Sequence, residues 1–532
     1  MKATVLFLIS SSIGIIIYGQ VGTQIAASIR CIGLKTWVTN ALTHPFRCVS
    51  DGKKERKDRV SSTNTESAQS SSRRHLNSHS HSNSDVLKNS FSWHQVGQDI
   101  NGEAQYDSSG YSVDMSSDGK RVIIGADLND GNGDNSGHAR VFEQVNGTDW
   151  RQVGGDIDGE APHDRAGGSV AMSSNGKRVI VGSYNNNGNG KQSGHARVFE
   201  EVEGKWEQVG RDIDGEEAED WSGESVDMSS DGKRVIIGAR YNDSNGEKSG
   251  HARIFAEVHG EWIQVGDDIS GEKNGDKSGF TVAINSNGRR VIVGAYHNDG
   301  NGSNSGHARV FEELNGRWLQ IGNDIDGESA ADESGTSVDI SADGKRVIVG
   351  APKNDGNGDF SGHARIFEEI NAAWVQVGED INGEAKDDRA GFSVSMDDSG
   401  KLVIIGAFNN DGNGDRSGHA RIFAEVGNIW SQVGHDINGE RTGDTSGSAV
   451  GISSDGERVI IGAMQNDGNG HDAGHCRVFY LSTPMDPSAS PSSIPSPSPS
   501  KEPSSDAKNS TANISTVITA FLFLLFCNMF KK

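Results

Sequence analysis

Tryptophan recurs through most of this chain at an almost fixed interval. Seven copies of a segment each begin at a tryptophan, and the first two of these tryptophans lie 57 residues apart and the others 56: Trp93, Trp150, Trp206, Trp262, Trp318, Trp374 and Trp430. A second series keeps the same period, and each of its members begins a segment like HARVF: His138, His195, His251, His307, His363, His419 and His475. Such self-similarity is the signature of a repeat architecture, so seven equivalent units are expected.

Each copy contains four short segments with the pattern of β-strands. In the first copy these are WHQVGQDI, GYSVDMSS, KRVIIGA and GHARVFEQ, of which the third is a continuous apolar run typical of a strand buried on both faces. Glycine contributes 70 residues and often stands in turn pairs such as Asn101-Gly102, Asp118-Gly119 and Asn132-Gly133. No segment keeps a helical period, so the repeats are expected to be all-β.

Four antiparallel strands per copy, repeated seven times, match the blades of a β-propeller. An open solenoid is the alternative, but it needs distinctive terminal units with a polar outer face, and the first and last copies look ordinary. We therefore predict a seven-bladed β-propeller over residues 92–482. Its repeated Trp, Phe and Val-Ile-Ile positions are expected to pack between adjacent blades.

The segment GFSVSMDDSGKLVIIGAFNNDGNGDRSGHARIF, Gly391 to Phe423, resembles the FG-GAP repeat of integrin α-subunit propellers. The shared features are an aromatic residue before a Ser-Val strand and a Gly-Ala pair after an apolar strand, with the full Gly350-Ala351-Pro352 in one copy. The resemblance implies that the Ser-Val strand is innermost and the Trp strand outermost. It then implies that Trp93 to Ile100 pairs with the last copy near Cys476 and closes the ring.

The two ends indicate export and attachment to a membrane. Residues 1–20 read as a signal peptide or signal anchor, and residues 21–91 as a largely disordered linker. Residues 483–513 form a Ser/Pro-rich stalk, and residues 514–530 are an apolar tail before Lys531 and Lys532. That tail is interpreted either as a short transmembrane anchor or as the removed signal for a glycosylphosphatidylinositol anchor. Export would make five sequons relevant to glycosylation: Asn146, Asn242, Asn301, Asn509 and Asn513.

Charge and cysteine usage exclude some functions. The formal net charge is −24, and so negative a chain repels phosphate backbones, which argues against a nucleic-acid partner. Of the four cysteines, Cys31 and Cys48 could form a disulfide in an oxidising compartment, and Cys476 replaces a repeated alanine and is expected to be a buried free thiol. No zinc or redox motif is present.

A loop of the form D-x-N-x-D is the candidate calcium site, and calcium is the one cofactor that the sequence suggests. It occurs in the first, fifth and sixth copies as Asp130, Asn132, Asp134; Asp355, Asn357, Asp359; and Asp411, Asn413, Asp415. Alternating oxygen ligands suit calcium, but a plain hairpin turn explains the same glycines, and both readings stay open. The calcium loop of FG-GAP proteins is not carried over, because its place holds only a short turn, Ser116 to Lys120.

Two other repeated features are interpreted as structural. Every copy has Asp-Ile-(Asp/Asn/Ser)-Gly-Glu followed by another Asp, as in Asp99, Glu103 and Asp107, and the arginine of HAR is the expected partner of these carboxylates, with calcium as the rival. The repeated histidine shares a strand face with that arginine and is expected to lie between blades and to bond locally.

The leading functional hypothesis is a cell-surface, adhesion-type propeller that presents loops to an extracellular protein or glycan. No catalytic motif appears, and no copy diverges in a way that singles out a catalytic pocket. A carbohydrate-active or other hydrolytic enzyme on the same scaffold is the second hypothesis, because a fold does not fix a function. A structural wall or coat protein is the third. Clustered, non-repeating acidic and aromatic side chains on one face would favour the enzyme.

Overall fold

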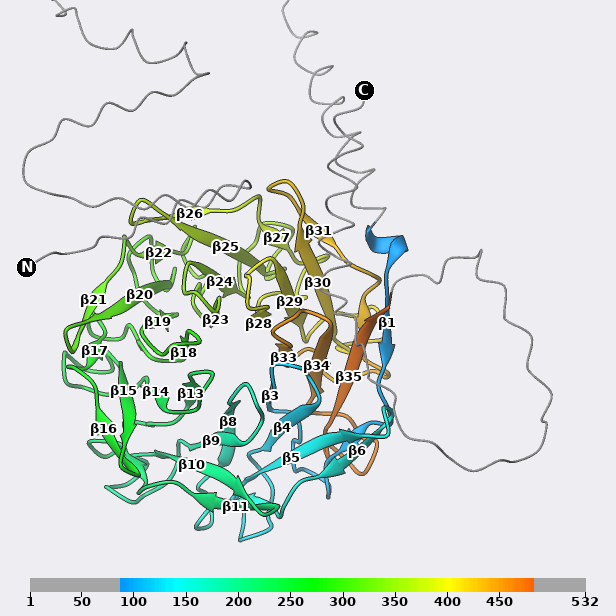
Figure 1. Cartoon of the computed structure of the whole chain (residues 1–532). Helices are drawn as coiled ribbons and strands as arrows, with labels where there is room; N and C mark the ends of the chain where they lie inside the picture. The colour runs from blue at the N-terminus through cyan, green and yellow to red at the C-terminus, as the bar shows by residue number, and fades with distance from the viewer. Residues whose placement is uncertain (1–86, 483–532) are drawn as a thin grey trace, which may run out of the picture. The chain divides into compact units, whose positions relative to one another are not determined.

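The repeated segments become strands, and the strands form seven antiparallel sheets arranged as the blades of a propeller (Figure 1). The computed structural model describes residues 87–482, so the predicted signal, most of the linker, the stalk and the tail lie outside the described residues. No helix within residues 87–482 is long and apolar enough to cross a membrane. The prediction of a seven-bladed, all-β propeller is confirmed.

Each blade uses one strand from each repeated position, counted outward from the centre of the ring. The inner strands are β3 (Ser112–Met115), β8 (Ala166–Met172), β13 (Ser225–Met228), β18 (Thr281–Ile284), β23 (Ser337–Ile340), β28 (Ser393–Met396) and β33 (Ala449–Ile452). The second strands are β4 (Arg121–Ala126), β9 (Arg178–Ser183), β14 (Arg234–Ala239), β19 (Arg290–Ala295), β24 (Arg346–Ala351), β29 (Leu402–Ala407) and β34 (Arg458–Ala463). The third strands are β5 (His138–Val145), β10 (His195–Val202), β15 (His251–Val258), β20 (His307–Leu314), β25 (His363–Ile370), β30 (His419–Glu425) and β35 (His475–Ser482).

The outer strand of each blade is interrupted, which the sequence pattern did not predict. Its first parts are β1 (Ser92–Gln95), β6 (Asp149–Gln152), β11 (Lys205–Gln208), β16 (Glu261–Gln264), β21 (Arg317–Gln320), β26 (Ala373–Gln376) and β31 (Trp430–Gln432). Its second parts are β2 (Ile100–Asn101), β7 (Ile157–Asp158), β12 (Ile213–Asp214), β17 (Ile269–Ser270), β22 (Ile325–Asp326), β27 (Ile381–Asn382) and β32 (Ile437–Asn438). Gly97, with a φ of 74°, stands at the break between β1 and β2, and this left-handed conformation favours glycine.

The first and last copies join in one sheet and so close the ring. Strand β1 pairs antiparallel with β35, with Trp93 opposite Leu481, and β2 pairs with the same strand, with Ile100 opposite Cys476. The ring closure implied by the FG-GAP resemblance is therefore confirmed. The chain before β1 adds to this contact, because residues 87–90 form a helical turn and Phe91 packs beside Trp93 on the last blades.

The hydrophobic core lies between adjacent blades, as predicted. One cluster joins Ile123 and Val141 of the first blade to Val170, Val179 and Phe199 of the second, and equivalent clusters follow around the ring. The cluster that spans the closure joins Ile460, Cys476 and Val478 to Met115, Ile124 and Phe142. Each sheet thus buries the apolar face of the next, which is the main stabilising term for such a fold.

Each tryptophan also hydrogen-bonds across a blade boundary. The indole N–H of Trp150 donates to the carbonyl of Val96 in the preceding blade at 2.8 Å, and that of Trp93 donates to the carbonyl of Val433 at 2.9 Å. The other five make the same bond: Trp206 to Val153, Trp262 to Val209, Trp318 to Val265, Trp374 to Ile321 and Trp430 to Val377. The ring that packs on a neighbour therefore also has its polar atom satisfied.

An arginine at the start of most second strands forms ion pairs across the boundary. Arg346 lies 2.9 Å from Glu368 in its own blade and 2.6 Å from Glu425 in the next. One copy further on, the three equivalent residues are Leu402, Ala424 and Leu481, and all three pack on the same hydrophobic cluster. The chain thus contains both an ionic and an apolar version of one contact.

We predict that Arg346→Leu alone lowers the free energy of unfolding by about 3 kcal/mol, because it leaves two carboxylates without their cation at a partly buried site. The triple variant Arg346→Leu, Glu368→Ala, Glu425→Leu copies the apolar version and should recover most of that loss. Urea unfolding of the three proteins checks both expectations. A triple variant no more stable than the single one would show that the two versions are not interchangeable.

Candidate ligand-binding site

Three positions at one end of the two innermost strands of each blade differ from blade to blade, although the residues around them repeat. Two of them flank the repeated turn before the inner strand: in the first blade they are Ser108, two residues before Gly110, and Tyr111, directly after it. The third is the residue that follows the second strand, Asp127 in the first blade. We call this set the variable rim, and in chain order it is Ser108, Tyr111, Asp127; Arg165, Gly168, Tyr184; Trp221, Glu224, Arg240; Lys277, Phe280, Tyr296; Glu333, Thr336, Pro352; Arg389, Phe392, Phe408; Thr445, Ser448, Met464.

The backbone at the first rim position has a left-handed conformation in every blade. The φ angles are 55° at Ser108, 56° at Arg165, 58° at Trp221, 55° at Lys277, 53° at Glu333, 56° at Arg389 and 54° at Thr445. Such angles are uncommon outside glycine and unusual for a β-branched threonine. The neighbouring loop holds this turn, as where the Trp221 N–H donates to the carbonyl of Gln192 at 3.2 Å. The turn is therefore common to all blades, whereas the side chain that it displays is not.

Over the second to fourth blades the rim side chains form one aromatic and cationic cluster. The Arg240 guanidinium lies 4.9 Å from the Trp221 ring, 4.6 Å from the Tyr241 ring and 5.2 Å from the Phe280 ring. Trp221 meets Tyr241 edge to face at 4.8 Å. Cation–π contacts of this kind fix the guanidinium among the rings.

Further contacts extend this cluster on both sides. The Tyr184 ring lies 5.4 Å from that of Trp221, and the Phe280 ring lies 4.4 Å from that of Tyr296. The Lys277 amine donates to the Tyr296 hydroxyl at 3.1 Å. All these side chains are half-buried, so each keeps part of its surface available to a ligand.

Two non-repeating carboxyl groups lie within the same rim. The Glu224 carboxylate is 2.9 Å from Arg240 Nε, and burial raises the pKa of Glu224 to about 7 although Arg240 opposes the shift. The Asp127 carboxylate is 3.0 Å from Arg165 and 3.3 Å from the Tyr184 hydroxyl, and burial raises its pKa as well. Desolvation thus outweighs the neighbouring cations at both groups.

This cluster was not predicted from the sequence, which was interpreted as having no copy that diverges. The sequence nevertheless contained a signal, because when the seven copies are aligned with one another, the rim positions are those at which the type of side chain changes from copy to copy. What the sequence could not show is that three such positions, which are spread over about twenty residues of one copy, meet those of the next blade.

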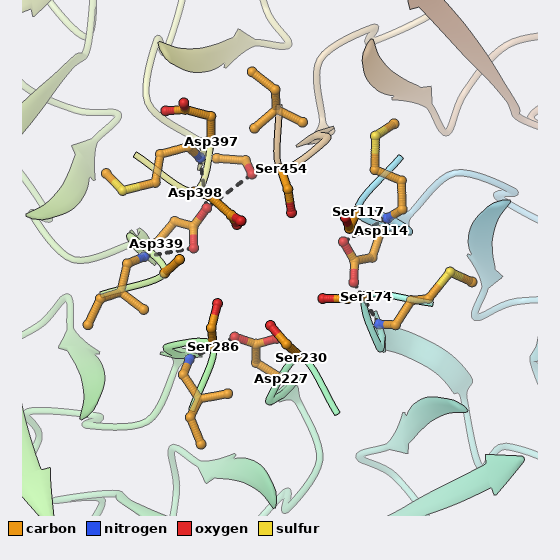
Figure 2. Close-up of a pocket in the computed structure, with 18 of the residues that line it drawn as sticks. Asp114, Ser117, Ser174, Asp227, Ser230, Ser286, Asp339, Asp397, Asp398 and Ser454 are labelled. Atoms are coloured by element: carbon orange, nitrogen blue, oxygen red, sulfur yellow. Dashed lines mark hydrogen bonds between the residues drawn. The ribbon is translucent and has the colours of Figure 1, made fainter. Parts of the chain in front are cut away.

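A second polar feature lines the centre of the ring. A cavity of about 140 Å³ is lined by Asp114, Asp227 and Asp339 of alternate inner strands and by serines such as Ser174 and Ser230 (Figure 2). Backbone hydrogen bonds run round it from N–H to carbonyl: Ser117 to Ser174, Ser174 to Ser230, Ser230 to Ser286, Ala342 to Asp398, Asp398 to Ser454, and Ser454 to Ser117. The last of these bonds joins the final blade to the first.

Each of these aspartates bridges two inner strands. Asp114 accepts from the Met115 N–H at 2.7 Å and from the Met172 N–H of the next blade at 2.6 Å. Burial raises the pKa of Asp114 to about 7 and that of Asp339 to about 6 in spite of such bonds, and it raises the pKa of Asp227 well above 3.8. We therefore interpret these carboxylates as structural groups that join neighbouring inner strands, and not as ligand-binding groups.

The nine calcium candidates lie in the loops between second and third strands, and the first two members of each set hold those loops. Asp130 Oδ1 accepts from the Asn135 N–H at 2.7 Å, while Asn132 Nδ2 donates to the carbonyl of Gly159 in the next loop at 2.8 Å. The equivalent bonds join Asp355 to Phe360, Asn357 to Gly383, Asp411 to Arg416 and Asn413 to Gly439. The third members differ, since Asp134 lies 3.6 Å from His163, Asp359 binds Lys386 and Asp415 is exposed. Calcium at these residues stays a prediction.

The second repeated carboxylate set is divided among three places. Asp107 accepts from the N–H groups of Glu103 and Ala104, Asp99 accepts from Gln95, and Glu103 lies 3.4 Å from Arg140. The predicted pairing with the arginine of HAR is confirmed for the glutamates: Glu103 with Arg140, Glu160 with Arg197, Glu216 with Arg253, Glu272 with Arg309, Glu328 with Arg365, Glu384 with Arg421 and Glu440 with Arg477.

The remaining predicted residues fall in different environments. Cys476 is a buried free thiol, as predicted, whereas Cys31, Cys48, Asn509 and Asn513 lie outside the described residues. Asn146 is exposed, and Asn301 is exposed while donating to the carbonyls of Gly327 and Glu328. Asn242 is buried and donates to Asp220 at 3.1 Å, so a glycan there would require this amide to leave its buried bond.

Comparison with known proteins gives one family. The family model described as "FG-GAP repeat" matches residues 101–142, 213–255 and 270–311. No curated protein sequence matches the chain. A candidate 6-phosphogluconolactonase from Bacteroides uniformis is structurally similar at 14% identity and a TM-score of 0.45, over 64% of this chain and 88% of that one. Identity and score are too low for an inference about activity.

The raised pKa of Asp114 gives a prediction for pH. Since its pKa is about 7 in the folded chain and about 3.9 when unfolded, the folded chain binds more protons between these values, and stability falls as pH rises from about 4 through about 7. We expect Asp114→Asn to flatten this fall in urea unfolding measured at several pH values. Exposed Asp149→Asn should keep the wild-type slope, and equal slopes for all three proteins would contradict the assignment.

Proposed function

We propose that this chain, a seven-bladed propeller in which three stretches match the FG-GAP repeat, is an extracellular binding protein that presents its variable rim to a protein or glycan ligand. The rim carries this proposal. Selection that only maintained the blades would repeat these positions as it repeats their neighbours, yet their side chains range from Trp221 to Thr445.

The composition of the cluster supports a binding role. The cluster contains the residue types that contribute most to binding energy in protein interfaces: Trp221, Arg240, Tyr241 and Tyr296. Large rigid rings bury much surface area at little cost in conformational entropy. The rings are held in place before any ligand arrives, because Arg240 lies among three of them. Such pre-organisation lowers the entropy lost on binding.

The ends of the chain support a place at the cell surface. An N-terminal apolar run predicts entry into the secretory route, and a Ser/Pro-rich stalk before an apolar tail predicts a spacer and an anchor. We propose that the propeller stands away from the membrane on this stalk. An adhesion role follows from that arrangement.

A hydrolytic enzyme is the second candidate, and Glu224 favours it. This carboxyl does not recur in the other copies, lies against the aromatic cluster and has a pKa of about 7, which is the range for a general acid. A carbohydrate substrate stacked on the rim rings would place a glycosidic bond near this group. The binding role remains the first proposal because the charged groups that act on Glu224 among the described residues are the cations Arg240 and Lys277, and a hydrolytic site needs a second carboxylate.

Trp221→Ala tests the binding role. We expect it to weaken binding by about 30-fold or more in isothermal titration against the best hit of a glycan array or a pull-down from extracellular protein, because it removes the central ring of the cluster. Ile263→Ala is the control, since it removes an exposed apolar side chain from the outer strand β16 of the same blade, outside the rim, and should leave affinity unchanged.

Glu224→Gln separates the two functions. A binding protein should keep most of its affinity in this variant, whereas an enzyme should lose turnover of the captured glycan while still binding it. Equal affinity of wild type, Trp221→Ala and Ile263→Ala for every captured ligand would contradict the proposed role of the rim.

A further inference from the structure

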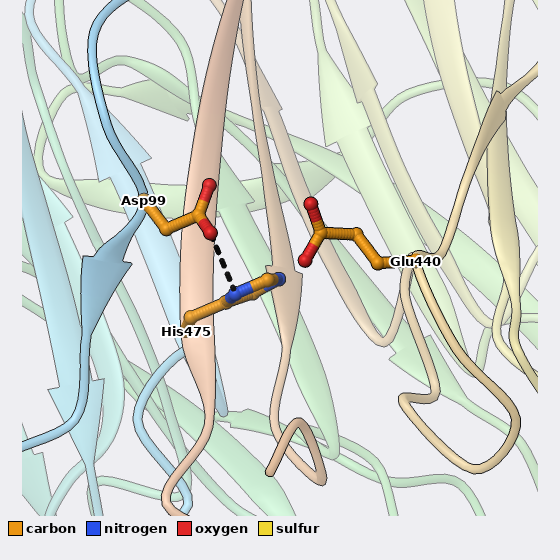
Figure 3. Close-up of side chains that lie close together, drawn as sticks. All are labelled: Asp99, Glu440 and His475. Carbon is orange, nitrogen blue, oxygen red and sulfur yellow. Dashed lines mark ion pairs between the residues drawn. The ribbon is translucent and has the colours of Figure 1, made fainter. Parts of the chain in front are cut away.

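The repeated histidine meets two carboxylates at the boundary between blades. At the last boundary, His475 lies on β35, Asp99 comes directly before β2, and Glu440 follows β32 of the preceding blade (Figure 3). One ligand atom of each side chain lies within 4.8 Å of the other two. His475 Nδ1 is 3.8 Å from Asp99 Oδ2, which is too long for a hydrogen bond.

The histidine was predicted to bond locally, and the structure does not show this. The side chain of His475 is only 1% exposed, yet neither ring nitrogen has a hydrogen-bond partner among the described residues. The same holds for both nitrogens of His138, His307 and His363. At least one ring nitrogen of each of the other three histidines is also buried without a partner, and since such a group costs free energy, its repetition in all seven copies calls for a ligand.

Each carboxylate has one oxygen held by the protein and one facing the imidazole. Asp99 Oδ1 accepts from Gln95 Nε2 at 2.7 Å, while its Oδ2 faces His475. At the first boundary Glu103 Oε1 lies 3.4 Å from Arg140, and its Oε2 lies 4.0 Å from His138. Glutamine and arginine thus orient the ligand groups, as outer partners do around bound metals.

From this geometry we propose that each blade boundary binds one divalent transition-metal ion of the zinc type through the histidine Nδ1, the aspartate Oδ2 and one glutamate oxygen. The trios are Glu103, His138, Asp156; Glu160, His195, Asp212; Glu216, His251, Asp268; Glu272, His307, Asp324; and Asp99, Glu440, His475. His363 likewise lies 3.9 Å from both Glu328 and Asp380, and His419 lies 3.9 Å from Glu384.

The donor set selects the class of metal. Imidazole nitrogen with carboxylate oxygen suits zinc and its neighbours, whereas calcium and magnesium take oxygen ligands alone. Asp99 is 30% exposed and Glu440 41%, which leaves an open side for entry and for a water ligand.

The charges of the site also allow a cation. The two carboxylates and the nearby Arg477 together give the site a net negative charge, and the carboxylate of Asp444 makes the local potential more negative. Arg477 donates to the carbonyl of Asn438 at 2.7 Å, so the guanidinium is held by the backbone. This inference is independent of the rim, because the histidines lie on third strands and the carboxylates flank the second parts of the outer strands.

Cobalt titration of the full chain, stripped of metal by a chelator, tests the proposal. Co²⁺ bound to imidazole and carboxylate gives visible absorption, and we expect excess Zn²⁺ to abolish it and excess Ca²⁺ to leave it unchanged. Histidines before the repeats, such as His75, His79 and His81, can add to the total, so the difference between variants is the readout.

The double variant Asp99→Asn, Glu440→Gln should bind one equivalent of Co²⁺ fewer than wild type, whereas the matched control Asp149→Asn, which changes an exposed aspartate outside every trio, should bind the wild-type amount. Both variants change partly exposed groups, and circular dichroism of the metal-free proteins checks that they fold. An unchanged equivalent count in the double variant, or displacement of Co²⁺ by Ca²⁺, would overturn the proposal.

Discussion

Burial of each sheet's apolar face against the next sheet is the interaction on which the rest of this structure depends. No blade has a core of its own, since Ile123 and Val141 of one blade are covered by Val170 and Phe199 of the next. A ring of such sheets has no uncovered end only if the last blade covers the first. Strand β1 provides this closure, because its pairing with β35 ties the start of the propeller to its end.

Polar contacts at the same boundaries then fix the spacing that the apolar contacts alone would leave loose. At the outer strands, the tryptophan indoles donate hydrogen bonds to the preceding blade. At the centre of the ring, Asp114 and its two equivalents accept hydrogen bonds from the neighbouring inner strand. Close approach is also enforced, because a side chain at Gly125 would collide with the backbone of Gly167 in the next blade. The Gly-Ala pair of the repeat therefore reflects contact between blades and not turn formation.

Repetition made the fold predictable and concealed the site. The period of Trp93 and its equivalents gave the blade count, and alternation within HARVF placed His and Arg on one face, where Arg140 lies 5.3 Å from the Phe142 ring. Strand interruption at Gly97 was missed although the sequence signals it, because Val96 is out of alternation with Trp93 and a glycine follows it. The rim escaped notice for a different reason: Trp221 and Arg240 are separated in sequence within one copy, and Tyr184 and Phe280 join them from the two neighbouring blades.

The rim side chains and the histidine trios have different proposed roles: the rim binds a ligand, and the trios join adjacent blades. Rim side chains are displayed by left-handed turns whose N–H groups bond to the neighbouring loop, so their geometry depends on how firmly adjacent blades are joined. The histidine trios lie at those joints, with each histidine at the start of a third strand and the carboxylates beside the outer strands. A cation there would bridge two blades through Glu440 on one side and His475 on the other. Metal loading would therefore stiffen the scaffold that positions Trp221 and Arg240 without touching either side chain.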